Sequence, residues 1–143
     1  MNQDQFEREG NFSLAMAIIR SLQKKGLLTA TEVAKIRTSL IERFKGNVHG
    51  QYFLGRCFFY GEGVVKDVNK AFQLFTKAAP KIIQYAEQGY AAEQFYTGVL
   101  YYNGWGVEKH KKTAQFWFEK AAKMGLVQAQ VFLKKHMKFG KLW

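Results

Sequence analysis

Apolar residues recur at intervals of three and four positions in two stretches of the chain, AFQLFTKAA at 71–79 and AQFWFEKAA at 114–122. This spacing places the apolar side chains on one side of an α-helix. An aromatic-rich run with helical spacing precedes each stretch and ends at a glycine, Gly61 or Gly104. Glycine adopts the left-handed conformation that often ends a helix at little cost. The pattern therefore predicts two pairs of helices, and we call the first helix of each pair helix A and the second helix B.

The two helix pairs are copies of one another. Sliding the chain by 43 places brings Gly55–Ala79 over Gly98–Ala122. Identical positions include Gly55 and Gly98, Gly61 and Gly104, Gly63 and Gly106, Val64 and Val107, Ala71 and Ala114, Phe75 and Phe118, and the Lys-Ala-Ala triplets at 77–79 and 120–122. Self-similarity at this period is typical of a helical array in which each unit buries its apolar face against a neighbour.

Glycines also indicate how the helices of a pair approach each other. Gly55 and Gly98 lie inside the predicted A helices, where glycine costs roughly 1 kcal/mol relative to alanine. Close approach of two helix backbones would offset that cost. The second turn glycine, Gly63 or Gly106, lets the chain reverse, so that helix B begins near residue 67 or 110.

This arrangement resembles the Sel-one-like repeat, a relative of the tetratricopeptide repeat. The residues that carry the resemblance in repeat 1 are Leu54-Gly55, Phe58, Gly61-x-Gly63-Val64, Lys70-Ala71 and Lys77-Ala78-Ala79. In repeat 2 they are Gly98, Tyr101, Gly104-x-Gly106-Val107, Ala114, Lys120-Ala121-Ala122 and the closing Gly125. The resemblance covers residues 46–134 and implies an all-α fold, an α/α solenoid of two helix pairs.

The chain departs from the family pattern at a few positions. Where the family has a small residue early in helix A, repeat 1 has Gly50 and repeat 2 has Glu93. The leucine before the helix A glycine becomes Thr97 in repeat 2. Repeat 1 also carries seven additional residues around Pro80. Seven residues make about two helical turns, so we expect the insert to lengthen helix B without rotating its apolar side.

The ends of the chain lie outside the two repeats. Phe6–Lys25 has helical spacing, Gly26 follows it, and Thr29 with Glu32 forms a capping-box pattern for a second helix that ends at Lys45. Residues 20–45 resemble a SHOCT-type short helical module. The expected domains are therefore a helical hairpin at 1–45 and the repeats at 46–143, with a C-terminal capping helix after Gly125.

Two repeats fall short of the three or so that an independent array generally needs. The N-terminal hairpin can supply the missing burial as a cap within the same chain, or it can pair with a second copy. Proteins with the resembled module often self-associate, and we predict a homodimer. The expected oligomerisation residues are Leu14, Ile18, Leu22, Val33, Ile36 and Leu40.

The composition indicates a basic protein and bears on its cellular location. The chain has 22 basic and 11 acidic residues, a net charge of +11, and residues 104–143 hold nine of the basic and two of the acidic ones. Such a field attracts acidic partners. The single cysteine excludes a disulfide scaffold and favours a cytoplasmic location. No apolar run reaches the roughly 18 residues that a membrane span requires.

The sequence contains little that indicates a catalytic, metal or phosphate-binding site. His49, His110 and His136 lie far apart without cysteine or carboxylate at ligand spacing, so we expect no metal and no cofactor. Cys57 lies among apolar residues and is interpreted as part of the core. The paired glycines of GEGVVK and GWGVEK lack the Gly-Lys-Ser/Thr ending of a phosphate-binding loop. The sequence predicts a protein that is not an enzyme.

Two candidate binding surfaces remain. In helical solenoids the A helices line a concave groove, where exposed aromatic and arginine side chains anchor partners. The predicted groove residues are Tyr52, Arg56, Tyr60, Val99, Tyr102 and Trp105. The predicted basic patch consists of Lys109, Lys111, Lys112, Lys134, Lys135, Lys138 and Lys141. These surfaces indicate an adaptor that binds a macromolecular partner, in the first place a protein. The alternative is a nucleic-acid-associated accessory protein that contacts phosphates or assists a nucleoprotein enzyme.

Overall fold

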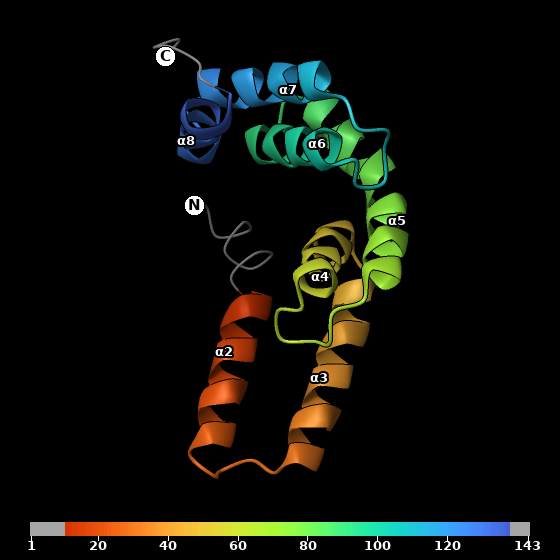
Figure 1. Ribbon diagram of the computed structural model, residues 1–143, viewed down its shortest axis with the longest axis vertical. Helices are drawn as coiled ribbons and strands as arrows, with labels where there is room; N and C mark the ends of the chain where they lie inside the picture. The colour runs from red at the N-terminus through yellow and green to blue at the C-terminus, as the bar shows by residue number, and fades with distance from the viewer. Residues whose placement is uncertain (1–10, 138–143) are drawn as a thin grey trace. The chain divides into compact units, whose positions relative to one another are not determined.

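The structure is a computed structural model that describes the backbone of residues 11–137 and the side chains of residues 14–137. Seven helices and no strand occur between residues 11 and 137, which confirms the predicted all-α helical repeat fold (Figure 1). The helices are α2 (Asn11–Lys24), α3 (Ala30–Lys45), α4 (Val48–Tyr60), α5 (Val68–Glu87), α6 (Ala91–Asn103), α7 (Lys111–Lys123) and α8 (Val127–His136). In repeat 1, α4 and α5 are helices A and B, and in repeat 2 these are α6 and α7.

The chain packs as two compact units, which we call unit 1 (residues 1–74) and unit 2 (residues 75–143). The border between them falls inside α5, between Leu74 and Phe75. Helix B of repeat 1 therefore contributes its first third to unit 1 and the remainder to unit 2. The boundary at 45 and 46 that the sequence predicts is a boundary between sequence modules and stays a prediction.

Unit 1 begins with a helical hairpin of α2 and α3, which lie side by side (Figure 1). The predicted capping box is present at the start of α3. The backbone N–H of Thr29 donates to Glu32 Oε2 at 2.8 Å, and the backbone N–H of Glu32 donates to Thr29 Oγ1 at 3.2 Å. The hydrogen bonds from Thr29 lower the pKa of Glu32. Gly26, with φ of 73°, lies in the turn before this cap.

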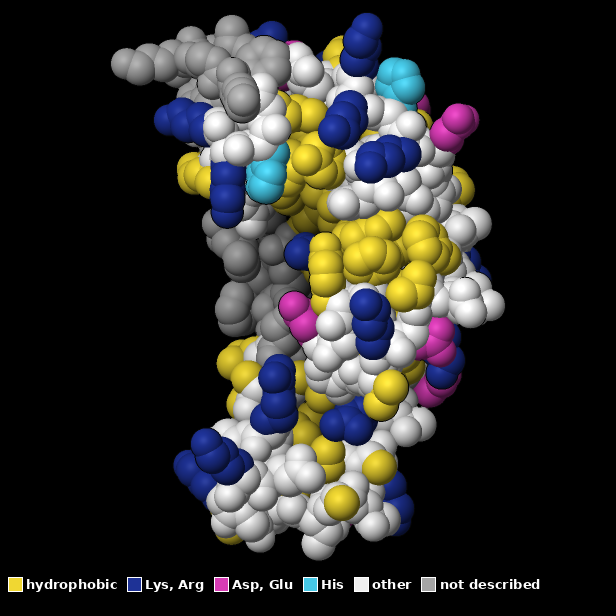
Figure 2. Space-filling view, viewed as in Figure 1, with side chains coloured by type: hydrophobic (Ala, Val, Ile, Leu, Met, Phe, Trp, Pro, Cys, Tyr) yellow, Lys and Arg dark blue, Asp and Glu magenta, His cyan; other side chains and the backbone are white. Residues whose placement is uncertain are grey.

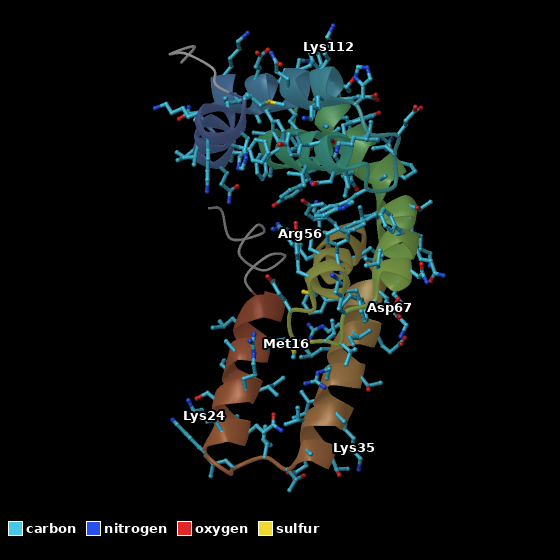
Figure 3. The ribbon with its side chains drawn as sticks, viewed as in Figure 1. Met16, Lys24, Lys35, Arg56, Asp67 and Lys112 are labelled. Carbon is cyan, nitrogen blue, oxygen red and sulfur yellow. The ribbon has the colours of Figure 1, made fainter. Side chains whose placement is uncertain are left out.

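The turn between α4 and α5 follows the predicted glycine pattern. Gly61 ends α4 in the left-handed conformation, with φ of 74°. The backbone N–H of Asp67 then donates to the carbonyl oxygen of Phe58 at 2.9 Å, which ties the start of α5 to the end of α4. The second glycine of the turn, Gly63, faces Met16 of α2: a methyl group added at Gly63 would lie 3.0 Å from Met16 Cε (Figure 3). The N-terminal hairpin thus packs on the turn of repeat 1.

Unit 2 repeats this turn between α6 and α7. Gly104 ends α6 with φ of 72°, and the backbone N–H of His110 donates to the carbonyl oxygen of Tyr101 at 2.9 Å. The two helices approach closely at Gly98, where an added methyl group would lie 2.6 Å from Phe118 Cδ1. Gly98 therefore makes room for a side chain of helix B, whereas we expected it to make room for the helix backbone.

The seven inserted residues lengthen helix B of repeat 1, as predicted. Helix α5 has 20 residues with Pro80 inside it, and α7 has 13. Pro80 is exposed, while Ile82 and Ala86 of the extension are buried in unit 2. The apolar side of the helix therefore continues through the insert.

Helix α8 begins in the same way as a helix A. The side-chain amide of Gln130 donates to the carbonyl oxygen of Ala122 at 3.1 Å, and Gln94 at the equivalent position of α6 donates to Ala86 at 3.3 Å. Leu133 of α8 is buried in the core of unit 2. Val127 and Val131 of the same helix are exposed. The covering surface of α8 is thus narrower than its apolar composition suggests.

Candidate functional site

The structure corrects the predicted groove at two positions. Tyr52 and Trp105 are buried, with 0% and 2% of their surfaces exposed, so neither side chain is offered to a partner. The ring of Trp105 stacks on Phe75 of α5, with centroids 4.4 Å apart and planes 3° apart. Tyr52 occupies the helix A position that corresponds to Phe95 in repeat 2, where the ring packs on Phe118. Both predicted anchors are core residues.

The other four groove residues keep accessible surface. In unit 1, Arg56 is half-buried and Tyr60 is exposed, one helical turn apart on α4. In unit 2, Val99 and Tyr102 are half-buried on α6 and pack against the core of that unit. The guanidinium carbon of Arg56 lies over the buried ring of Tyr52, 6.0 Å from its centroid.

Unit 2 brings one residue of the predicted groove together with one of the predicted basic patch. Lys111 Nζ at the start of α7 lies 6.0 Å from the ring centroid of Tyr102 at the end of α6. The ring of Phe132 from α8 also stands edge-on to Tyr102 at 5.1 Å, and that of His136 lies 6.3 Å away. We call Tyr102, Lys111, Phe132 and His136 the aromatic–basic surface. Three helices contribute to it, so residues 34 positions apart in the chain become neighbours.

Sequence reasoning missed Phe132 and His136 as members of this surface. The two rings lie 4.4 Å apart on one side of α8. Their spacing of four positions was an available signal, because residues four apart face the same way on a helix. What periodicity did not show is that this side of α8 turns toward Tyr102.

The rest of the predicted basic patch is exposed where it is described. Lys109, Lys112, Lys134 and Lys135 are all exposed, and Lys112 points outward from α7 (Figure 3). Lys138 and Lys141 lie outside the described residues. Basic side chains are spread over the visible surface and acidic ones are sparse, in keeping with the charge of +11 (Figure 2).

The predicted oligomerisation residues divide between surface and core. Leu14 and Ile18 are each 50% exposed on one side of α2, while Met16 and Ile19 of the same helix are buried on the other. Leu22, Ile36 and Leu40 are half-buried. The prediction was wrong for Val33, which is 3% exposed and therefore part of the core of unit 1.

Cys57 is a buried thiol of low reactivity. Burial raises its pKa from 9.0 to about 11, and the nearby charge of Glu62 acts in the same direction. A thiol that keeps its proton is a poor nucleophile and a poor metal ligand. Among residues 14–137, no three histidine, cysteine, aspartate or glutamate side chains are grouped so that they could hold a metal ion. None of the described helices is long and apolar enough to cross a membrane.

Comparison with known proteins agrees with the repeat pattern. The Sel1 repeat model matches residues 48–79 and 94–126, and the SHOCT domain model matches residues 1–51. The crystal structure of a Sel1 repeat protein from Oxalobacter formigenes is similar, with 26% sequence identity and a TM-score of 0.41. The match covers 85% of this chain and 43% of that protein, so this chain spans less than half its length. We conclude that the chain carries two Sel1 repeats, α4 with α5 and α6 with α7, after an N-terminal segment that matches the SHOCT domain.

Proposed function

We propose that this protein is a non-enzymatic adaptor that binds an acidic protein partner through the aromatic–basic surface of unit 2. Sel1 repeats in general mediate protein–protein interactions. The observation that carries the proposal is the position of Lys111 over Tyr102, with Phe132 and His136 beside the same ring. Aromatic side chains that keep one accessible edge beside a cation are typical anchors of binding surfaces.

The charges around this surface support an acidic partner. Between residues 75 and 137, unit 2 carries nine lysines against four acidic side chains, one of which, Glu93, is buried. Lys111 and Lys112 also lie at the start of α7, where a positive charge is disfavoured by the helix dipole. An acidic group on a partner would compensate both the dipole and the lysine charges. Complementary charge speeds encounter and selects partners more than it adds affinity.

The experiment is affinity capture from the native organism with the full-length chain, in which the double variant Y102S/K111E is compared with K77E. Lys77 is an exposed lysine of the same unit on α5, so K77E changes charge in the same way at a different surface. We expect an acidic protein to be retained by wild type and K77E and lost by the double variant. Equal retention by all three proteins would reject the surface.

A nucleic-acid-associated role is the second candidate, favoured by the same juxtaposition of lysine with aromatic rings. Bases can stack on such rings while lysines contact phosphates. Salt separates the two functions, because affinity carried by phosphate contacts falls steeply as salt rises. Filter binding of duplex DNA and RNA at low and moderate salt tests this role. Absence of binding at low salt would exclude direct contact with nucleic acid.

A further inference from the structure

The two repeats differ sharply in polarity at the turn between helices A and B. Repeat 1 has four exposed apolar side chains there, and repeat 2 has polar side chains at the same four positions. The pairs are Tyr60 and Asn103, Val65 and Glu108, Val68 and Lys111, and Phe72 and Gln115. The turns themselves are alike, with the same left-handed glycines and the same hydrogen bond from the start of helix B to the end of helix A. The fold therefore does not require apolar residues at these positions in repeat 1.

These side chains lie around the α4–α5 turn of unit 1. Val68 and Phe72 lie four positions apart on α5, so they face the same way. The ring of Phe59 links α5 to α4, because it stands edge-on to Phe72 at 6.3 Å and to Tyr60 at 5.0 Å. Val65 lies in the turn and is 88% exposed. We call Tyr60, Val65, Val68 and Phe72 the α4–α5 patch.

Lysine side chains beside this patch outnumber its one uncapped carboxylate, that of Glu62, which is exposed in the turn. Lys66 precedes α5 and Lys70 lies on its first turn, and both are exposed. The carboxylate of Asp67 accepts the backbone N–H of Lys70 at 3.0 Å, so it is engaged in capping the helix. Residues 14–74 as a whole carry ten basic and four acidic side chains. An apolar centre beside an excess of lysines is complementary to an apolar side chain flanked by acidic ones.

We propose that the α4–α5 patch is a second docking surface, which takes a protein segment that presents leucine or phenylalanine between acidic residues. This role goes beyond the aromatic–basic surface, which lies in the other unit. A second copy of the chain fits the patch less well, because it carries the same excess of basic over acidic side chains in this unit.

The test uses a short fluorescein-labelled peptide with two leucines among aspartates and glutamates, and a matched peptide with serines in place of the leucines. Binding to the full-length chain is measured by anisotropy and mapped by amide NMR. The variant V68K installs the residue of repeat 2 and removes apolar surface. Its matched control is N69K, which also installs the residue of repeat 2, Lys112, and adds the same charge at an exposed neighbouring position.

We expect the leucine peptide to bind wild type and shift the amide signals of α4 and α5, and V68K to weaken it about tenfold. N69K should change the affinity less than about twofold, and F72Q should repeat the loss seen with V68K. No binding of the leucine peptide, equal binding of the serine peptide, or equal effects of V68K and N69K would overturn the proposal. A wild-type dimer that V68K dissociates would overturn it in favour of self-association.

One variant distinguishes failure of this proposal from failure of the proposed function. Y102S/K111E changes only unit 2, so it should leave binding of the leucine peptide to the α4–α5 patch within about twofold of wild type. If the double variant lost peptide binding and V68K kept it, the peptide would bind at the aromatic–basic surface. That result would overturn the present inference.

Discussion

Gly106 lies directly against the backbone of Phe75. A methyl group added at Gly106 would lie 2.5 Å from the carbonyl oxygen of Phe75, a distance that requires the backbone to move. Gly63, the equivalent glycine of repeat 1, lies instead against the flexible side chain of Met16. Helix α5 of the preceding repeat therefore supports the turn at Gly106, and the N-terminal helix α2 supports the turn at Gly63.

This difference predicts unequal effects of one substitution. Gly63 and Gly106 have φ of 74° and 73°, so alanine costs about 1 kcal/mol at either from backbone conformation alone. G106A must also displace backbone and should lower the free energy of unfolding by about 3 kcal/mol, against about 1.5 kcal/mol for G63A. Urea unfolding followed by circular dichroism measures both. Equal losses would contradict the support of the second turn by the Phe75 backbone.

The burial of Trp105 predicts that it acts on stability. W105A should lower the free energy of unfolding by about 3–5 kcal/mol, because it empties a fully packed site and removes the stack on Phe75. W105F retains a ring and should cost less. The control is the exposed Tyr60, where Y60A should stay within about 0.5 kcal/mol of wild type. Thermal and urea unfolding check the order, and a stable W105A would place Trp105 at the surface after all.

Cys57 predicts a loss of stability in alkaline solution. Its pKa is about 11 in the folded chain against 9.0 ordinarily, so between these values the unfolded chain loses the thiol proton while the folded chain keeps it. The contribution of the thiol is complete below pH 9 and declines as pH rises toward 11. C57A lacks it. The gap between the urea midpoints of wild type and C57A should therefore change between pH 8 and pH 11, and a constant gap would contradict the raised pKa.

The exposed side of α2 predicts self-association. Leu14 and Ile18 form an apolar pair of which half the surface is accessible, and we expect a homodimer in which this pair meets its copy. Sedimentation equilibrium at micromolar concentration should give about twice 16.5 kDa, and I18S should return the chain to 16.5 kDa. A wild-type chain that sediments only at 16.5 kDa would remove the dimer.

The turns and helix ends could be predicted from sequence because a few residues admit one inexpensive conformation there. Gly61 and Gly104 end their helices in the left-handed region, and Thr29 with Glu32 forms the capping box. The insert around Pro80 was predictable for a similar reason, since two whole helical turns keep the apolar side in line.

The assignment of aromatic residues to core or surface could not be predicted in the same way. Periodicity shows which side of a helix is apolar, but the neighbour that covers it comes from elsewhere in the chain. Trp105 follows the glycine that ends α6, a position typical of surface turns, yet α5 covers it. Tyr102, Lys111 and His136 meet only because three helices converge. Met16 lies outside the repeat pattern, so nothing in the sequence indicated its contact with Gly63.

The most direct measurement of the central claim is the affinity of the captured acidic partner for K111E and for K77E, by isothermal titration calorimetry at fixed ionic strength. Both variants reverse one lysine charge in unit 2, and only Lys111 lies over Tyr102. We predict that K111E weakens binding about tenfold or more and that K77E changes it less than about twofold. Equal affinities of the two variants would contradict a binding surface at Tyr102 and Lys111.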